Sequence, residues 1–82
     1  MEVIEVIENK KAYIELLLLE DEQEDMIDRY LDKGKMYLLD DKGIKFECVV
    51  TNEGYSVLEI KNIATVPEYQ GKGYAKFFLL II

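Results

Sequence analysis

Histidine is absent from the 82-residue sequence, and cysteine occurs only once, as Cys48. The absence of histidine excludes a histidine-based catalytic triad, and with only one cysteine beside it a zinc site within this chain is excluded too. A single cysteine also excludes an internal disulfide. The sequence contains one proline and five glycines and no low-complexity run, which argues against a disordered chain.

The chain is short, so it has room for a single domain over residues 1–82. Half of its residues are apolar and 33% are charged, as in an ordinary soluble domain. A chain of this size buries only about 60% of its unfolded surface, so we expect a marginal hydrophobic core.

The formal net charge is −7, and the acidic residues concentrate in residues 1–33. The absence of a basic face leads us to expect no nucleic-acid partner. The acidic half either attracts a cationic amine or is a solvated face, and the sequence leaves both readings open. The N-terminus has neither the basic region nor the apolar stretch of a signal peptide, so we expect a cytoplasmic protein without a membrane partner.

Hydrophobic periodicity predicts the first part of the fold. Residues 2–7 alternate as a short strand does, and residues 10–19 carry apolar side chains at helical spacing after a candidate cap at Asn9. Asp21 and Glu24 form the pattern of a capping box for a second helix, which we expect to end at Gly34.

Three strands then follow in a meander, separated by turns rich in Asp, Asn and Gly. The second strand alternates in a way that predicts one buried face, which would contain Cys48. Pro67 ends the third strand, and a last helix begins near Gly71–Gly73. The predicted strands cover residues 36–39, 44–51 and 56–66. The predicted fold is an α/β (α+β) domain of order β-α-α-β-β-β-α with an antiparallel meander sheet.

The segment between the last strand and the last helix has the features of an anion site. Gly71 and Gly73 allow a sharp turn close to a ligand, and the free N–H groups of the following helix start favour negative charge. Lys72 and Lys76 add positive charge nearby. A strand–glycine–helix turn is also often purely structural, so this pattern alone leaves both readings open.

The sequence Gln70-Gly-Lys-Gly-Tyr-Ala75 resembles the Gln/Arg-x-x-Gly-x-Gly/Ala signature of the GNAT superfamily of N-acetyltransferases. Residues 58–69 resemble the strand and loop that precede this signature. The likeness covers the whole chain in element order, although only residues 57–76 are specific. Residues 12–34 are similar to a bacterial subgroup labelled indole-acetate-type acetyltransferases.

The resemblance implies acetyl-CoA as co-substrate and transfer of its acetyl group to a primary amine of a small molecule or peptide. The backbone of Ile63 and Thr65 is implied to pair with the pantetheine arm, and one N–H group to polarise the thioester carbonyl. The remaining cofactor-binding residues implied are those of the signature: Gln70, Gly71, Lys72, Gly73, Tyr74 and Ala75. Tyr74 is also expected to pack beneath the loop.

Glu59 occupies the place where histone-type members of the superfamily carry a general-base glutamate, so the resemblance implies that it deprotonates the acceptor ammonium. Alternatively, Glu59 is a solvated carboxylate, or one paired with Lys61 on the same face of the strand. No metal site is expected.

The sequence departs from the superfamily pattern at Thr65 and Ala75, and above all in length, since the part that supplies the acceptor wall is missing. We therefore expect the N-terminal half of such a domain, either truncated or self-associating through the apolar run 77–82 and the open sheet edge. The alternatives to an active acetyltransferase are an inert CoA-binding remnant and a small self-associating interaction module.

Overall fold

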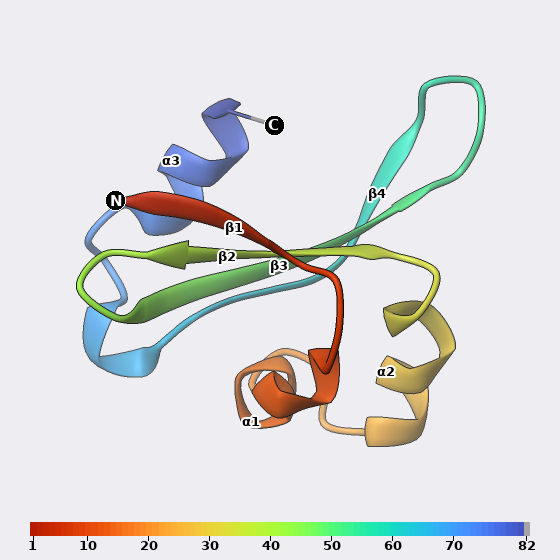
Figure 1. Ribbon diagram of the computed structural model, residues 1–82, viewed down its shortest axis with the longest axis horizontal. Helices are drawn as coiled ribbons and strands as arrows, with labels where there is room; N and C mark the ends of the chain where they lie inside the picture. The colour runs from red at the N-terminus through yellow and green to blue at the C-terminus, as the bar shows by residue number, and fades with distance from the viewer. Residues whose placement is uncertain (82) are drawn as a thin grey trace.

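The computed structural model describes residues 1–81, which form one sheet with helices on both of its faces (Figure 1). The elements follow the predicted order of an α+β domain. They are β1 (Glu2–Val6), the 3-10 turn η1 (Lys10–Tyr13), α1 (Ile14–Leu17), α2 (Glu24–Leu31), β2 (Lys35–Asp40), β3 (Ile44–Asn52), β4 (Leu58–Thr65), the 3-10 turn η2 (Pro67–Tyr69) and α3 (Tyr74–Ile81).

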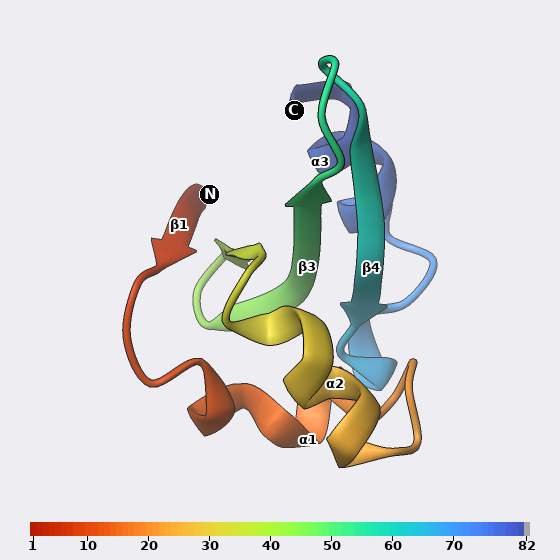
Figure 2. The ribbon, with the colours of Figure 1, turned by 90° about the vertical axis from the view of Figure 1, so that its right-hand side faces the viewer.

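The sheet has four strands in the order β1-β2-β3-β4, and every neighbouring pair is antiparallel. Strand order therefore equals chain order, as a meander predicts. Among residues 1–81, β4 is paired on one side only, to β3, so its other side is an edge. Figure 2 shows α1 and α2 gathered below the sheet, with α3 behind β3 and β4.

Each face of the sheet has its own hydrophobic core. The core under α1 and α2 consists of Val6, Leu17, Ile27, Leu31, Met36, Leu38 and Val49. The core under α3 consists of Leu39, Phe46, Cys48, Val50 and Phe78. Cys48 is buried and free, as expected.

The prediction that β3 has a single buried face was wrong. Lys45, Glu47 and Thr51, on the face expected to meet solvent, are 9%, 0% and 8% exposed. The physical reason is that helices cover both faces of the sheet. Alternate side chains of β3 therefore enter two different cores, and neither set faces water.

The single helix predicted over residues 10–19 was also wrong. The segment begins as a 3-10 turn and becomes helical only over Ile14–Leu17. Asn9 makes no side-chain cap among the described residues and instead adopts a left-handed conformation with φ 56°. Asparagine tolerates this conformation better than other residues, and it turns the chain out of β1.

The second helix begins later than the capping-box pattern predicted. Its N-cap is Gln23, and the Asp21 carboxylate accepts a 3.4 Å hydrogen bond from the Gln23 N–H. Gly34 follows the helix, but glycine is required there because a side chain would not fit, and not because the backbone adopts a left-handed conformation. A Cβ at Gly34 would lie 2.8 Å from Cγ1 of Val49 and 2.9 Å from the Val50 carbonyl oxygen.

A β-bulge interrupts the pairing of β3 with β4. Val49 pairs with Asn62 and Val50 pairs with Ile60, so Lys61 is an extra residue in β4. A bulge shifts the alternation of side chains, and here it brings Asn62 onto the face covered by α1.

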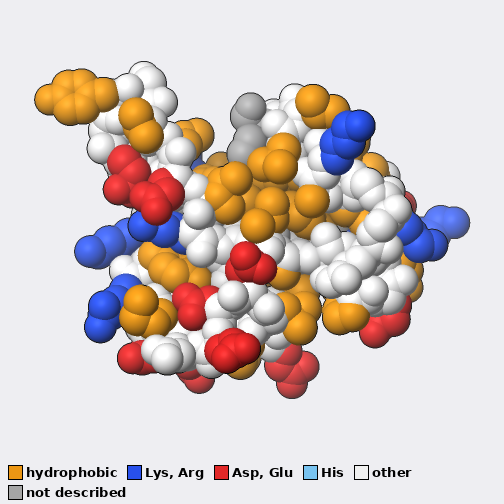
Figure 3. All heavy atoms as spheres, turned by 180° about the vertical axis from the view of Figure 1, so that it is seen from behind, with side chains coloured by type: hydrophobic (Ala, Val, Ile, Leu, Met, Phe, Trp, Pro, Cys, Tyr) orange, Lys and Arg blue, Asp and Glu red, His pale blue; other side chains and the backbone are white. Residues whose placement is uncertain are grey.

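The terminal apolar run forms α3, except Ile82, which lies outside the described residues. Phe78 is fully buried, whereas Leu79, Leu80 and Ile81 are 46%, 77% and 50% exposed. Figure 3, seen from behind, shows apolar side chains gathered in the upper middle of the molecule. Within residues 1–81, no helix is both long enough and apolar enough to cross a membrane.

Candidate functional site

The side of β4 that does not pair with β3 presents free backbone groups within the described residues. Val66 donates a 2.9 Å hydrogen bond to the Lys45 carbonyl oxygen, which fixes the phase of the ladder between β3 and β4. In an antiparallel ladder hydrogen-bonded pairs alternate with pairs that are not. The register therefore turns the N–H and C=O groups of Ile63 and Thr65 away from β3, toward the edge.

The loop after β4 continues this edge into the start of α3. Gly71 and Gly73 have φ values of 82° and 86°, in the left-handed region that favours glycine. An added Cβ at either position would meet nothing within 4 Å, so open space lies in front of the backbone. Gln70, Lys72 and both glycines are exposed, and α3 begins at Tyr74. Free N–H groups at a helix start beside open space are suited to hold a pyrophosphate.

Two contacts hold this loop against the hairpin between β2 and β3. The Tyr74 hydroxyl donates a 2.8 Å hydrogen bond to the Asp41 carboxylate, 33 residues earlier in the chain. This hydrogen bond raises the pKa of Tyr74, with burial as a smaller cause. The ammonium group of Lys45 lies 3.9 Å from the centroid of the Tyr69 ring, a cation–π distance. Tyr74 is half-buried and packs against the core under α3, and its expected place beneath the loop stays a prediction.

The side chains of the other predicted cofactor residues lie on the surface around the loop. The Gln70 amide Nε2 lies 3.5 Å from the Thr65 carbonyl oxygen, at the limit of a hydrogen bond. Nζ of Lys72 lies 5.9 Å from the Tyr69 ring centroid. Ala75 is half-buried against the core under α3.

Glu59 lies at the other end of β4 and is paired with a lysine. Its carboxylate is 3.1 Å from Nζ of Lys61, and its side chain is 51% exposed. Glu59 is four residues before Ile63, or about 13 Å at the usual rise of a strand. Its role as a base stays a prediction.

Sequence reasoning missed a buried polar cluster beneath α1, formed by Glu47, Asn62 and Tyr30. The Asn62 amide donates to the Leu17 carbonyl oxygen at 2.9 Å and to the Tyr30 hydroxyl at 3.0 Å. Within residues 1–81, both carboxylate oxygens of Glu47 and Oδ1 of Asn62 are buried without any hydrogen-bond partner. The sequence contained one indication of this burial. Helices were predicted both before and after the meander, and this order implies that both faces of β3 are covered.

Burial shifts the pKa values of Glu47, Tyr30 and the neighbouring Cys48. Desolvation, and then the charge of Glu20, raises the pKa of Glu47 from 4.5 to about 8. Desolvation raises the pKa of Tyr30, with smaller contributions from Asp21 and Glu47. Desolvation and the neighbouring charge of Glu47 raise the pKa of Cys48 to about 12, so this thiol stays protonated.

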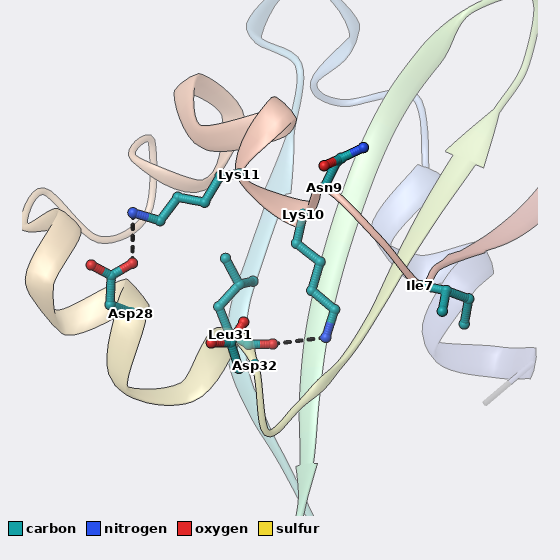
Figure 4. A pocket seen from close by; sticks show the side chains of 7 residues that line it. All are labelled: Ile7, Asn9, Lys10, Lys11, Asp28, Leu31 and Asp32. Carbon is teal, nitrogen blue, oxygen red and sulfur yellow. Dashed lines mark hydrogen bonds and ion pairs between the residues drawn. The ribbon is translucent and has the colours of Figure 1, made fainter.

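A cavity of about 420 Å³ lies where η1 meets α2 (Figure 4). The two lysines that line it make contacts that connect η1 to α2. The Lys10 ammonium donates to the carbonyl oxygens of Leu31 and Gly34 at 2.8 and 2.7 Å, and so caps the C-terminal end of α2. Lys11 pairs with Glu24 and with Asp28. The groups that hold this junction together are already paired, and none of the predicted site residues lines the cavity.

Comparison with known proteins supports the fold. The sequence matches no family model and no curated protein. Among solved structures, the chain superposes on an IAA acetyltransferase from Bacillus cereus with a TM-score of 0.82 at 29% identity. It superposes on a GNAT family acetyltransferase from Elizabethkingia anophelis with acetyl-CoA bound (TM-score 0.85, 29% identity). A Bacillus subtilis acetyltransferase in complex with CoA gives a TM-score of 0.84 at 29% identity.

Each of these superpositions covers 96% of this chain but only 53%, 52% and 53% of the three solved chains, respectively. The chain therefore spans about half the length of the structures that it matches. The expected resemblance to the N-terminal half of an acetyltransferase of this kind is confirmed at the level of fold.

Proposed function

We propose that this chain, which has the fold of the N-terminal half of a GNAT-family acetyltransferase, binds acetyl-CoA along the edge of β4 and supports acetyl transfer to a primary amine. One observation carries the proposal. The outward backbone groups of Ile63 and Thr65 lead directly into Gly71 and Gly73, whose left-handed conformations leave open space at the start of α3.

When bound, acetyl-CoA supplies the acetyl thioester, and the residues of this chain supply its position. Ile63 and Thr65 pair with the pantetheine arm as a neighbouring strand would. Gly71, Gly73 and Tyr74 donate N–H groups to the pyrophosphate. An outward N–H group of β4 stabilises the charge that develops on the thioester oxygen during transfer. Catalysis then comes mainly from holding thioester and amine together.

The test is a calorimetric titration of acetyl-CoA into the full chain, with pantetheine, which lacks the pyrophosphate, as control ligand. We expect saturable binding to acetyl-CoA and much weaker binding to pantetheine. Binding without turnover of any amine supports the inert CoA-binding alternative. Failure of the folded wild type to bind acetyl-CoA contradicts the proposal and favours an interaction module.

A pair of glycine variants separates binding from backbone strain. Gly73→Ala and Gly54→Ala place the same side chain at φ 86° and φ 89°, and in both cases the added Cβ meets nothing within 4 Å. Because Gly54 lies in the turn between β3 and β4, Gly54→Ala reports the cost of strain alone. We expect similar losses of stability and a loss of acetyl-CoA affinity only in Gly73→Ala. Equal affinities would show that the loop around Gly73 does not hold the pyrophosphate.

A further inference from the structure

A second cavity gathers positive charge in a chain that is acidic overall. It has a volume of about 430 Å³ and lies between α2 and the hairpin of β3 and β4. Three cations line it, Arg29, Lys33 and Lys61, and Glu53 is the acidic residue of the lining, whereas the whole chain has a formal net charge of −7. Figure 3 shows Lys and Arg side chains gathered below the projecting hairpin.

The contacts of the fold do not account for two of these cations. A positive charge near the end of a helix often serves the last carbonyl groups, but Lys10 already caps the C-terminal end of α2. Arg29 and Lys33 are exposed, and among residues 1–81 neither is within ion-pair distance of a carboxylate. Lys61 is 3.1 Å from the Glu59 carboxylate. The cavity therefore holds two positive charges that the described chain does not neutralise.

The other polar groups of the lining also favour an anion. The Glu53 carboxylate accepts a 2.5 Å hydrogen bond from the Thr51 hydroxyl. Oδ1 of Asn52 accepts from the Gly54 N–H at 2.9 Å, so the NH₂ group of this amide is left to act as a donor. A guanidinium group next to ammonium and amide donors is the combination that binds carboxylates and phosphates in proteins.

The balance of charge favours a carboxylate over a phosphate. The three cations of the lining stand against Glu53 in the lining and Glu59 beside Lys61, which leaves one positive charge. A single carboxylate neutralises this charge. A phosphate group carries up to two negative charges near pH 7 and would leave an excess.

The cavity is connected to the proposed thioester site through β4. Lys61 lines the cavity and precedes Ile63 by two residues, or about 7 Å at the usual rise of a strand. A molecule whose carboxylate lies beside Lys61 can therefore extend along β4 to the backbone edge at Ile63. An α-amino acid is too short for this, because its amine is attached next to its carboxylate.

We infer that the cavity between α2 and the β3–β4 hairpin binds the carboxylate of the acetyl acceptor, with Arg29, Lys33 and Lys61 as its partners. The acceptor is then an amino acid whose primary amine is separated from its carboxylate by a chain of several carbons. This inference rests on the proposed function, for which it names the class of acceptor.

A binding test that does not depend on turnover uses the Arg29 side chain. Arg29 is the only arginine of the chain, so its Nε–H group gives a single arginine signal in ¹⁵N-labelled protein. The probes are ε-aminocaproate and ε-aminocaproamide, which share their length and their ammonium group and differ in the carboxylate. We expect ε-aminocaproate to shift the Arg29 signal saturably and the amide to leave it unchanged. No shift, or equal shifts by both probes, overturns the inference.

Lys33→Gln and Lys42→Gln are matched variants, because each removes the charge of one exposed lysine. Lys42 lies in the turn between β2 and β3, at the other end of β3 from the cavity. We expect Lys33→Gln to raise the Kd of ε-aminocaproate, read from the Arg29 signal, by about threefold to fivefold. Lys42→Gln should leave this Kd within about twofold, because salt screens distant charges. Equal effects of the two variants would show that only net charge matters and would overturn the inference.

Acetyl transfer to the same two probes tests the link to the proposed function. In the wild type, kcat/KM should be about tenfold higher for ε-aminocaproate than for its amide, and Arg29→Gln should bring this ratio close to one. Equal kcat/KM values in the wild type contradict the inference and leave the proposed function intact. Absence of turnover together with a saturable Arg29 shift contradicts the proposed transfer and leaves the carboxylate site in place.

Discussion

The burial of Glu47 predicts how the stability of the whole domain depends on pH. Its pKa rises from 4.5 to about 8 on folding, so between these two values the folded chain holds a proton that the unfolded chain has released. Stability must therefore fall as the pH rises from about 4.5 to about 8, and this contribution is constant outside that window. At 1.36 kcal/mol per pH unit, the total change is about 5 kcal/mol as an upper bound.

That change is large compared with the stability expected for this chain. Domains have about 0.05–0.15 kcal/mol of stability per residue, or about 4–12 kcal/mol for a chain of this length. The ionised form of Glu47 thus removes a substantial part of the free energy of unfolding. Replacing Glu47 by glutamine keeps the shape of the side chain and removes its charge.

Urea unfolding of the wild type and of Glu47→Gln at several pH values between 5 and 9 measures this effect. We expect the stability advantage of the variant to grow by about 1.4 kcal/mol per pH unit up to about pH 8 and then to level off. Glu59→Gln is the control, because its exposed carboxylate should leave the slope of the wild type unchanged. If the wild type and Glu47→Gln lose stability in parallel, the carboxyl group is not held protonated by burial and the reasoning fails.

Three further substitutions test the supports around the site. Tyr74→Phe removes the 2.8 Å hydrogen bond to Asp41 and should weaken acetyl-CoA binding by about threefold to tenfold in calorimetry. Unchanged affinity would show that the loop keeps its conformation without this hydrogen bond. Lys10→Met removes the donor to the carbonyl groups of Leu31 and Gly34 at the C-terminal end of α2 and should lower the free energy of unfolding by about 1–3 kcal/mol in urea. Gly34→Ala places a Cβ 2.8 Å from a side chain of the core and should cost about 1–3 kcal/mol in the same assay; a neutral result would mean that the helix end shifts freely.

The sequence predicted the elements whose signals are local. The turn at residues 40–43 and the strands on either side follow from periodicity and turn residues, and the last helix follows from the glycines before it. The outward direction of the backbone at Ile63 and Thr65 depends on the register with β3. No local pattern contains that register, and only the resemblance to a known family placed these residues at the site.

Burial on the second face was missed for a different reason. Alternation along β3 was interpreted as core against water, although a helix pair precedes the meander and another helix follows it. Such an arrangement covers both faces, so Glu47 could be recognised as buried from the element order alone. The bulge at Lys61 had no such signal, because an extra residue in one strand is visible only when its partner is known.

The identity of strand order and chain order has a consequence for how this protein is made. Each strand pairs with the one synthesised just before it, so the sheet is able to grow in step with the ribosome. The glycine loop and α3 emerge after the four strands, and α3 then packs against a face of the sheet that is already paired. We therefore expect a nascent chain that has emerged only as far as Thr65 to resist protease while it still lacks affinity for acetyl-CoA.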